Sequence, residues 1–433
     1  MSEILSLKLI ELFEHQENLN TKIKYEQLTE NDIRHLEKLQ EENKLSYSYT
    51  GGSESSLQIT SNSFIGSLSL TGPNVRINIL PKIFKDNANK WKDINIFVNY
   101  AMNDEFDFLE NARHYYDQSS ESTFSNILYQ TLIVEYENLM KKGLLKSYVI
   151  HAENASSMRG KLLMQHQMLN DAMKRPQFFC EFDELEYDSI ENRVILEALT
   201  VIERSSDNQK MRMKSMDLAQ RLSGLVEKTS VPRLARKRMM QSYNRQNLRY
   251  RRIHQICDQI IDKSGIDDIY RGDTSYVVPV FYDMNELFEN FIQNLFLKYH
   301  NGVETQHSEK AWDGKGDLGP RQMRPDVIIR DEGVCKHIID VKYKTKNISS
   351  GDLYQLGFYM HEFGKKNPDG KPVPYAFAIT PEFGNAGSGT YTSRTGLKVY
   401  VKRIDVKTCL NLMKTKNFND LETEVKNWII PLD

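Results

Sequence analysis

Long hydrophobic runs are absent from this sequence. The longest apolar run, Tyr276 to Tyr282, has seven residues and contains a proline. A helix that crosses a bilayer needs about 18 or more apolar residues in succession, so no membrane span is expected. The first residues, Met1-Ser2-Glu3-Ile4, lack the basic segment and the cleavage site of a signal peptide, so no signal peptide is expected either.

Cysteine is scarce and unclustered. The chain has four cysteines, none of them in a C-x-x-C pair: Cys180, Cys257, Cys335 and Cys409. The absence of clustered cysteines argues against a zinc site and against a disulfide framework, and an iron–sulfur cluster built from such scattered residues is disfavoured. This usage suits a reducing cytoplasm.

The chain has no excess of charge of one sign and no nucleotide-binding loop. The formal net charge is −2 over 433 residues, so any contact with nucleic acid must come from a local basic patch. No G-x-x-x-x-G-K-[ST] sequence occurs, and the chain is not expected to bind a nucleoside triphosphate by itself. The glycine-rich run 384–390 precedes neither that motif nor a helix, which favours a surface loop over a phosphate-binding loop.

The spacing of apolar residues predicts several parts in a chain of this length. The first forty residues are predicted to be helical, with Thr29 as an N-cap. Alternating stretches between Leu45 and Leu80 predict a β-meander. We predict an N-terminal α+β region (1–115), a mostly helical middle region (116–270), and a C-terminal α/β domain with a mixed sheet flanked by helices (271–433).

Two strongly apolar strands predicted near the C-terminus each carry an aspartate. Asp326 begins the first, and Asp340 follows Ile339 in the second, with a turn between them. Side chains alternate faces along a strand, so Asp340 and Lys342 point the same way. A carboxylate beside a core is costly unless it is paired or binds a metal. The pattern predicts a divalent-cation site with Asp326, Asp340 and the Val341 carbonyl as ligands, and with Lys342 beside an attacking water.

Two predicted helices supply further polar groups. One begins at Asp283 and carries Glu286 and Glu289 beside its apolar stripe, and either acid could complete the cluster. The other contains Gln355 and Tyr359, which share a face and can bond a phosphate or the water shell of a metal. The alternatives are solvated helix acids, a tyrosine at the edge of the core, and a structural pair between Asp340 and Lys342.

A basic segment without acids extends from Arg233 to Arg252. Its cations are Arg233, Arg236, Lys237, Arg238, Arg245, Arg249, Arg251 and Arg252. In a nearly neutral chain this local excess predicts a salt-sensitive surface for the DNA backbone, with contacts from Arg245, Arg249, Arg251 and Arg252. The alternative is a helix face that pairs with acids such as Asp258 and Asp262.

These motifs carry a resemblance to known families. The pattern Asp326…Asp340-Val341-Lys342, with Glu289 upstream and Gln355 and Tyr359 downstream, resembles the PD-(D/E)XK nuclease superfamily. From about residue 75 to 400 the chain resembles McrC-like subunits of the McrBC modification-dependent restriction systems. The motifs are Ile79-Leu80-Pro81-Lys82-Ile83, Met158-Arg159-Gly160-Lys161-Leu162, Tyr187-Asp188, Glu191-Asn192-Arg193, Leu287-Phe288-Glu289, Met323-Arg324-Pro325-Asp326, Ile339-Asp340-Val341-Lys342-Tyr343 and Asp352-Leu353-Tyr354-Gln355.

The resemblance implies a Mg²⁺-dependent DNA endonuclease subunit of a type IV restriction system. Its partner would be an McrB-like AAA+ GTPase ring, which usually carries the domain that reads modified cytosine, and whose GTP hydrolysis it would stimulate. By the same resemblance Asp326 and Asp340 bind Mg²⁺, Lys342 orients the attacking water, Glu289 completes the acidic cluster and Gln355 supports it. The sequence leaves open whether Mn²⁺ can replace Mg²⁺.

Two expectations concern assembly. One active centre cuts one strand, so a break in double-stranded DNA requires a second copy of the nuclease complex. The family docks its partner through the N-terminal region, so docking is expected on the meander between Leu45 and Leu80. The competing hypothesis is a DNA-bound adaptor or GTPase activator with a vestigial nuclease site, against which the intact Asp326, Asp340 and Lys342 argue.

Overall fold

The protein is described by a computed structural model over residues 8–15, 19–49, 56–87, 90–102, 124–206, 208–264, 280–313, 319, 321–344, 347–384 and 387–431. It forms two compact units, one from residues 1–124 with 280–433 and the other from residues 125–279. The first unit combines the predicted N-terminal region with the predicted nuclease domain, and the three-part division stays a prediction. Within the described ranges, no helix is long and apolar enough to cross a membrane.

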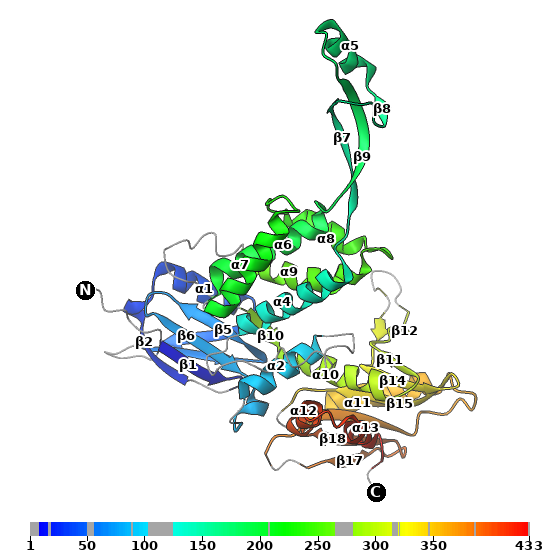
Figure 1. The fold of residues 1–433 in the computed structure, drawn as a ribbon. Helices are drawn as coiled ribbons and strands as arrows, with labels where there is room; N and C mark the ends of the chain where they lie inside the picture. Colours follow the sequence, from blue (N-terminus) through cyan, green and yellow to red (C-terminus); the bar gives the residue numbers. More distant parts are fainter. Residues whose placement is uncertain are drawn as a thin grey trace. The chain divides into compact units, whose positions relative to one another are not determined.

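The N-terminal part of the first unit contains two small sheets (Figure 1). Its elements are β1 (Lys8–Phe13), β2 (Leu19–Lys24), η1 (Tyr25–Gln27), α1 (Glu30–Glu41), β3 (Leu45–Tyr49), β4 (Ser56–Ser61), β5 (Phe64–Leu70), β6 (Val75–Leu80), η2 (Lys82–Phe84) and α2 (Lys90–Ala101). One sheet has the order β1-β6-β5-β10, where β10 (Val280–Asp283) comes from the later part of the sequence. Gly66 permits this pairing, because a Cβ there would collide with the Val280 carbonyl.

The prediction that the first forty residues are helical is wrong where the structure has β1 and β2. A short apolar run is ambiguous between helix and strand, and the parallel pairing of β1 with the buried β6 decides for strand. From Thr29 onward the prediction is confirmed, because the Thr29 side chain accepts a hydrogen bond from the Asp32 amide at the start of α1. The predicted strands of the meander are also present as β3 to β6; the turn at residues 51–53 lies outside the described residues.

The C-terminal part of the first unit is built on a mixed sheet, as predicted, and this sheet has six strands. The elements after β10 are α10 (Met284–Tyr299), β11 (Val303–Thr305), β12 (Glu309–Trp312), β13 (Arg321–Met323), β14 (Val327–Asp331), β15 (Val334–Val341), α11 (Ser350–Gly364), β16 (Tyr375–Pro381), β17 (Gly389–Thr392), β18 (Lys398–Ile404), α12 (Val406–Lys414) and α13 (Phe418–Asn427). The sheet order is β11-β14-β15-β16-β18-β17. Because β15, β16 and β18 are parallel, their carboxyl ends share one edge.

Helix α11 covers one face of this sheet. Leu356 and Met360 of the helix pack with Ile338, Ala378 and Val401 of the strands in one buried core. On α10 the predicted cap and stripe are confirmed: the Asp283 side chain accepts from the Asn285 amide, and the stripe residues are buried, namely Met284, Leu287, Phe288, Phe291, Ile292 and Leu295. The packing of α11 and α10 therefore fixes where the polar residues of these helices lie relative to the sheet.

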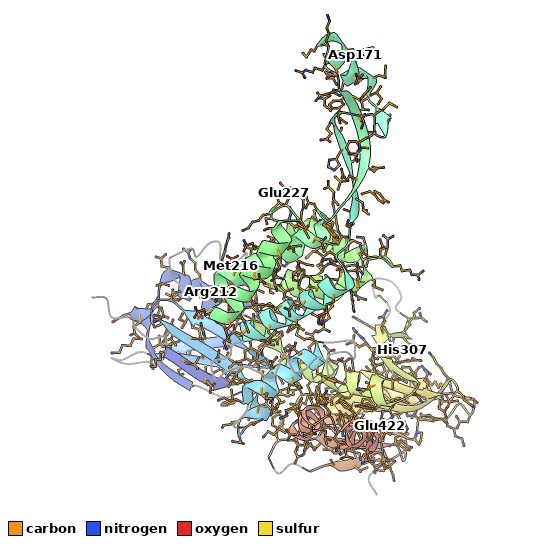
Figure 2. All side chains as sticks on the ribbon, in the orientation of Figure 1. Asp171, Arg212, Met216, Glu227, His307 and Glu422 are labelled. Atoms are coloured by element: carbon orange, nitrogen blue, oxygen red, sulfur yellow. The ribbon has the colours of Figure 1, made fainter. Side chains whose placement is uncertain are left out.

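The second unit consists of a helical part and a projecting hairpin. Its elements are α4 (Phe124–Lys142), β7 (Ser147–Ala155), β8 (Lys161–Leu162), α5 (Met164–Ala172), β9 (Phe178–Glu186), α6 (Ile190–Ser205), α7 (Gln209–Ser223), α8 (Arg233–Gln241), η4 (Leu248–Tyr250) and α9 (Arg251–Ser264). We call residues 147–186 the arm, because β7 and β9 carry α5 away from the helices (Figure 1). Figure 2 shows Asp171 at the far end of the arm and Glu227 on the helical part.

Candidate functional site

The hairpin of β14 and β15 sets two aspartates side by side. Val327 pairs with Ile339 in its antiparallel register, so one further step puts Asp326 opposite Asp340. The turn uses Glu332 and Gly333, both with positive φ, as tight hairpins require. The Val341 amide donates to Asp326 Oδ2 at 2.7 Å, which fixes the Asp326 carboxylate over the end of β15.

Lys342 joins the two aspartates. Its Nζ lies 2.8 Å from Asp340 Oδ1 and 3.8 Å from Asp326 Oδ2. The side chain of Asp340 is only 1% exposed, and its other oxygen, Oδ2, is buried without a hydrogen-bond partner among the described residues. A buried carboxylate oxygen with no partner requires a specific explanation, and a bound cation provides one.

Burial controls the charges at this cluster. It raises the pKa of Asp340 to about 6, Lys342 opposes that shift, and Asp326 adds to it. Burial also raises the pKa of Asp326, where Lys342 again opposes and Glu289 adds. For Lys342, burial disfavours the charge, but Asp340 and Asp326 outweigh it and raise the pKa. The single ammonium of Lys342 therefore faces two carboxyl groups whose ionisation is disfavoured by burial. A divalent cation would favour the ionised form of both.

Of the two candidate acids on α10, Glu289 is the one that faces the cluster. Its charge raises the pKa of Asp326, whereas Glu286 is exposed. Glu289 Oε1 accepts from Gln293 Nε2 at 2.9 Å and from Gln306 Nε2 at 3.1 Å. Gln293 also donates to the Asp326 carbonyl at 3.2 Å, so it ties Glu289 to the start of β14. The sequence alone did not single out Gln293.

Gln355 and Tyr359 meet each other, as their shared helix face predicted. Gln355 Nε2 donates to the Tyr359 hydroxyl at 2.7 Å, and the Arg324 amide approaches the same hydroxyl at 3.4 Å. Tyr359 is 5% exposed and packs in the core under α11. Its burial therefore favours a role in positioning the strand that leads to Asp326 and does not support the predicted contact with DNA.

The residue after Lys342 links the site to the N-terminal sheet. The Tyr343 hydroxyl donates to Glu14 Oε1, which also accepts from the Lys82 amide at 2.8 Å. Burial raises the pKa of Glu14 to about 7, while the hydrogen bond from Tyr343 lowers it. Lys82 belongs to the Pro81-Lys82 motif. Through the Lys82 amide, this motif therefore holds Glu14, the buried partner of Tyr343, which follows Lys342.

Arg403 is a candidate that no sequence pattern singled out. In the parallel register Thr380 of β16 pairs with Arg403 of β18, two residues beyond the row of Asp340, Ala378 and Val401, so Arg403 lies on the same face as Asp340. Its Nη2 donates to Asn347 Oδ1 at 3.0 Å, but Nε and Nη1 are buried and unpaired in the described part of the chain. Unpaired guanidinium donors at this edge suit an anion such as phosphate.

The basic segment divides into buried and exposed cations. Arg236 is buried and forms ion pairs with Asp258 and Asp262, and Arg233 also pairs with Asp262, at 3.0 Å. For these two arginines the helix-pairing alternative is correct. Arg252 is half-buried and lies 3.2 Å from Glu135. The exposed cations are Arg233, Lys237, Arg238, Arg245, Arg249 and Arg251.

The aromatic residues of the same segment are structural. The Tyr250 hydroxyl donates to Asn192 Oδ1 at 3.0 Å and accepts from the Leu145 amide. The Tyr243 hydroxyl lies 2.9 Å from His254 Nδ1, and burial lowers the pKa of His254 to about 4. The Asn192 motif therefore anchors α6 to the chain that enters the arm.

Comparison with known proteins identifies the family. A family model described as McrBC 5-methylcytosine restriction system component matches residues 59–369. No curated protein matches the sequence. A chain in the refined half-complex from a tetradecameric assembly of Thermococcus gammatolerans McrB AAA+ hexamers with bound McrC is similar, with a TM-score of 0.64 and 16% identity over 98% of this chain and 100% of that chain. This likeness shows a shared fold.

A chain of the Thermococcus gammatolerans McrBC complex also matches, with a TM-score of 0.48 and 19% identity over 67% of this chain and 88% of that chain. The match of the family model extends over most of the sequence, from the meander to α11. The protein therefore belongs to the family of McrBC 5-methylcytosine restriction system components.

Proposed function

We propose that this subunit is a Mg²⁺-dependent DNA endonuclease of the PD-(D/E)XK type, acting on DNA in a complex with an McrB-like AAA+ GTPase. The observation that carries the proposal is the meeting of Asp326, Asp340 and Lys342 at the end of one hairpin, with Glu289 beside them. The structural-pair alternative explains the contact between Lys342 and Asp340. It leaves unexplained why the second oxygen of Asp340 is buried without a partner among the described residues.

The residues present fit a hard divalent cation. Asp326 and Asp340 would hold it, with the Val341 carbonyl and Glu289 as further oxygen donors, and Mg²⁺ or Mn²⁺ accepts such a set. The bound ion would supply Lewis acidity and a more acidic water. Lys342 is held between the two carboxylates and would orient the attacking water, and Arg403 would hold a phosphate of the same strand. Arg403 on β18 lies two strands away from the β15 strand that carries Asp340, and neighbouring strands are about 4.8 Å apart. Successive phosphates of one DNA strand advance about 3.4 Å along the helix axis, so this separation corresponds to a few nucleotides.

The direct test is cleavage of modified DNA by the complex reconstituted with its GTPase partner. Asp340→Ala and Lys342→Ala should each lower the cleavage rate by about 10³-fold or more, because each removes several kcal/mol of charge stabilisation from the transition state. Stimulation of GTP hydrolysis should persist in both variants. Asp331→Ala is the matched control, since Asp331 is an exposed residue of the same hairpin.

Two outcomes would contradict the proposal. Undiminished cleavage by both variants would mean that the assigned site is not the nuclease centre. If the wild-type complex stimulates GTP hydrolysis and binds DNA, but makes no cut with either Mg²⁺ or Mn²⁺, the adaptor with a vestigial site would be the correct function. Circular dichroism of each variant separates loss of chemistry from loss of fold.

For the partner, we propose docking through the arm. The arm exposes many large apolar side chains, whereas every residue of β6 in the meander is buried. Many exposed apolar side chains on one element favour a protein interface, and methionine adapts well to a partner surface. The exposed residues are Tyr148, Ile150, Met158, Met164, Met168, Leu169, Met173, Phe178 and Leu185.

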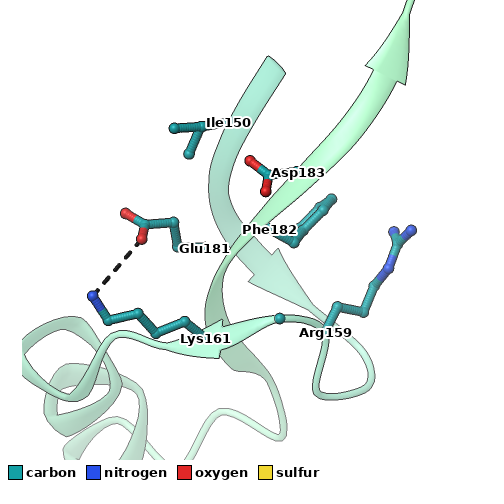
Figure 3. Close-up of a pocket in the computed structure, with 7 residues that line it drawn as sticks. Ile150, Arg159, Lys161, Glu181, Phe182 and Asp183 are labelled. Carbon is teal, nitrogen blue, oxygen red and sulfur yellow. Dashed lines mark ion pairs between the residues drawn. The ribbon is translucent and has the colours of Figure 1, made fainter. Parts of the chain in front are cut away.

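A pocket beside β8 adds charge to this surface (Figure 3). Gly160 makes the tight approach possible, because it has a φ of 61° and a Cβ there would collide with the Glu181 carbonyl. The Arg159 guanidinium stacks on the Phe182 ring at 4.4 Å, and Lys161 lies 3.9 Å from Glu181. The motif Arg159-Gly160-Lys161 therefore shapes the outer half of the arm.

Co-elution with the GTPase partner tests the docking surface. Met168→Asp with Leu169→Asp should abolish co-elution, while Leu225→Asp, an exposed apolar residue outside the arm, should leave it intact. Loss of docking through Leu9→Asp or Tyr25→Asp, with the arm variants still bound, would return the interface to the N-terminal region. Deleting residues 1–75 is a poor test, because β10 pairs with β5 and the deletion would disrupt the fold.

A further inference from the structure

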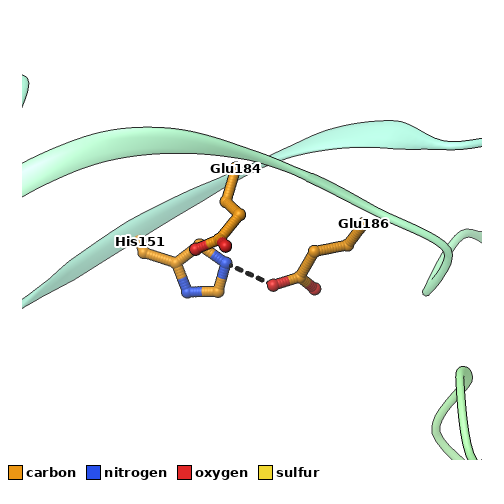
Figure 4. Close-up of side chains that lie close together, drawn as sticks. All are labelled: His151, Glu184 and Glu186. Atoms are coloured by element: carbon orange, nitrogen blue, oxygen red, sulfur yellow. Dashed lines mark ion pairs between the residues drawn. The ribbon is translucent and has the colours of Figure 1, made fainter.

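Three side chains converge at the root of the arm. His151 of β7 and Glu184 and Glu186 of β9 each offer one ligand atom, and these atoms lie within 4.8 Å of one another (Figure 4). One imidazole nitrogen and two carboxylate oxygens form a recognised donor set for a first-row transition metal. None of these residues belongs to the nuclease hairpin or to the basic segment.

The ladder of the arm fixes this arrangement. Val149 pairs with Glu184 and His151 pairs with Phe182 in a continuous register of nine residue pairs. Residues two apart on a strand share a face, so Glu184, Glu186 and His151 all lie on one face of the hairpin. The His151 ring stacks on Phe182 at 5.8 Å with an interplanar angle of 27°, which further restricts the orientation of the imidazole.

The ligand atoms of this cluster lack some of the hydrogen-bond partners that they could have. His151 Nε2 lies 2.8 Å from Glu186 Oε1, yet this buried nitrogen forms no hydrogen bond to any described residue. The Glu184 carboxylate has no ion pair or hydrogen bond in the described part of the chain, and it lies beside the Glu186 carboxylate. Two adjacent carboxylates and an imidazole nitrogen thus face one point.

We propose that His151, Glu184 and Glu186 bind one Zn²⁺ ion, or a similar transition-metal dication, with water completing the coordination. Zinc bonds to imidazole and carboxylate are about 2.0–2.2 Å long, and donors this close need only small side-chain rotations to share one ion. An imidazole ligand favours zinc over Mg²⁺. The ion would cross-link β7 to β9 where the arm leaves the helices and would stiffen the arm.

The test is a titration of the full-length, metal-free protein with ZnCl₂, followed by calorimetry. The Asp340→Asn background is used so that the nuclease cluster does not contribute to the signal. We expect one zinc ion per chain, with the affinity weakened at least about tenfold by His151→Ala and by Glu184→Gln, since even groups behind the ligands of a metal site are worth that much. The matched control is His166→Ala, an exposed histidine of the same arm that stacks on Phe179.

Amide hydrogen exchange supplies a second readout that does not depend on activity. Zinc should slow exchange in β7 and β9 of the control protein and leave the His151→Ala protein unchanged. The proposal is overturned if His151→Ala and His166→Ala bind zinc equally well, or if no zinc binds in the Asp340→Asn background. Because the nuclease cluster is silent in this design, neither result bears on the proposed endonuclease activity.

Discussion

Two long antiparallel hairpins of this chain have opposite environments. In β14–β15 the apolar residues Ile338 and Ile339 are fully buried, and so is the charged Asp340. In β7–β9 the apolar residues Tyr148 and Ile150 are 75% and 68% exposed. One hairpin hides a carboxylate, and the other presents apolar side chains to solvent.

Both arrangements cost free energy in the isolated chain. Burying an ionised carboxylate without full pairing costs several kcal/mol. Apolar area that stays exposed lacks the stabilisation of about 25 cal/mol per Å² that burial would give. Under the proposed function each cost is offset by binding: a cation would bind at Asp340, and an apolar partner surface would cover the arm. Function is therefore most visible in this chain where a residue type and its environment disagree.

The largest expected difference is between two isoleucines. Ile339→Ala should lower the free energy of unfolding by about 2–5 kcal/mol, because it leaves a cavity in a closed core. Ile150→Ala, the same change on the arm, should stay within about 0.5 kcal/mol, because its side chain contacts mainly water. Urea unfolding of the full chain measures both values. A large decrease in stability for Ile150→Ala would mean that the arm is packed rather than exposed.

A smaller effect should come from pH, through Glu14 behind the buried hairpin. Its pKa is raised to about 7 from 4.5, so the folded chain holds a proton that the unfolded chain releases, and stability falls as pH rises through that window. Glu14→Gln removes the ionisation and keeps the hydrogen-bond acceptor. The variant should match the wild type near pH 4.5 and be more stable by about 2 kcal/mol at pH 8, given about 1.4 kcal/mol for each pKa unit and a discount for relaxation. Parallel stability curves for the two proteins from pH 5 to 8 would contradict this assignment.

The smallest effect on stability is expected at the exposed arginines of the basic segment. Replacing Arg245, Arg249 and Arg251 with Glu should leave the free energy of unfolding within about 0.5 kcal/mol per residue. It should weaken DNA binding and flatten the dependence of log K on log salt by about 0.9 for each phosphate that is no longer neutralised. Arg252 is kept, because its pairing with Glu135 serves the fold. An unchanged salt slope would remove this segment from the DNA surface.

The sequence predicted what depends on local spacing. The two-residue period of a strand was enough to place Asp340 and Lys342 together, and the Asp283 cap defined the start of α10. The rest required tertiary contacts: Gln293 bonds to the Asp326 carbonyl, Arg403 lies on the same sheet face as Asp340, and β1 becomes a strand only by pairing with β6. Tyr148 and Ile150 alternate like core residues, and only the structure shows that these side chains are exposed to solvent.

Binding of Mn²⁺ to the full chain, followed by the electron paramagnetic resonance of the free ion, is the sharpest test of the proposed cation site at Asp340. The experiment uses the His151→Ala background, which silences the arm, with Asp340→Asn set against the exposed Asp331→Asn. We predict that one bound ion is lost in Asp340→Asn and retained in Asp331→Asn. Equal Mn²⁺ binding by the two proteins would show that Asp340 holds no cation.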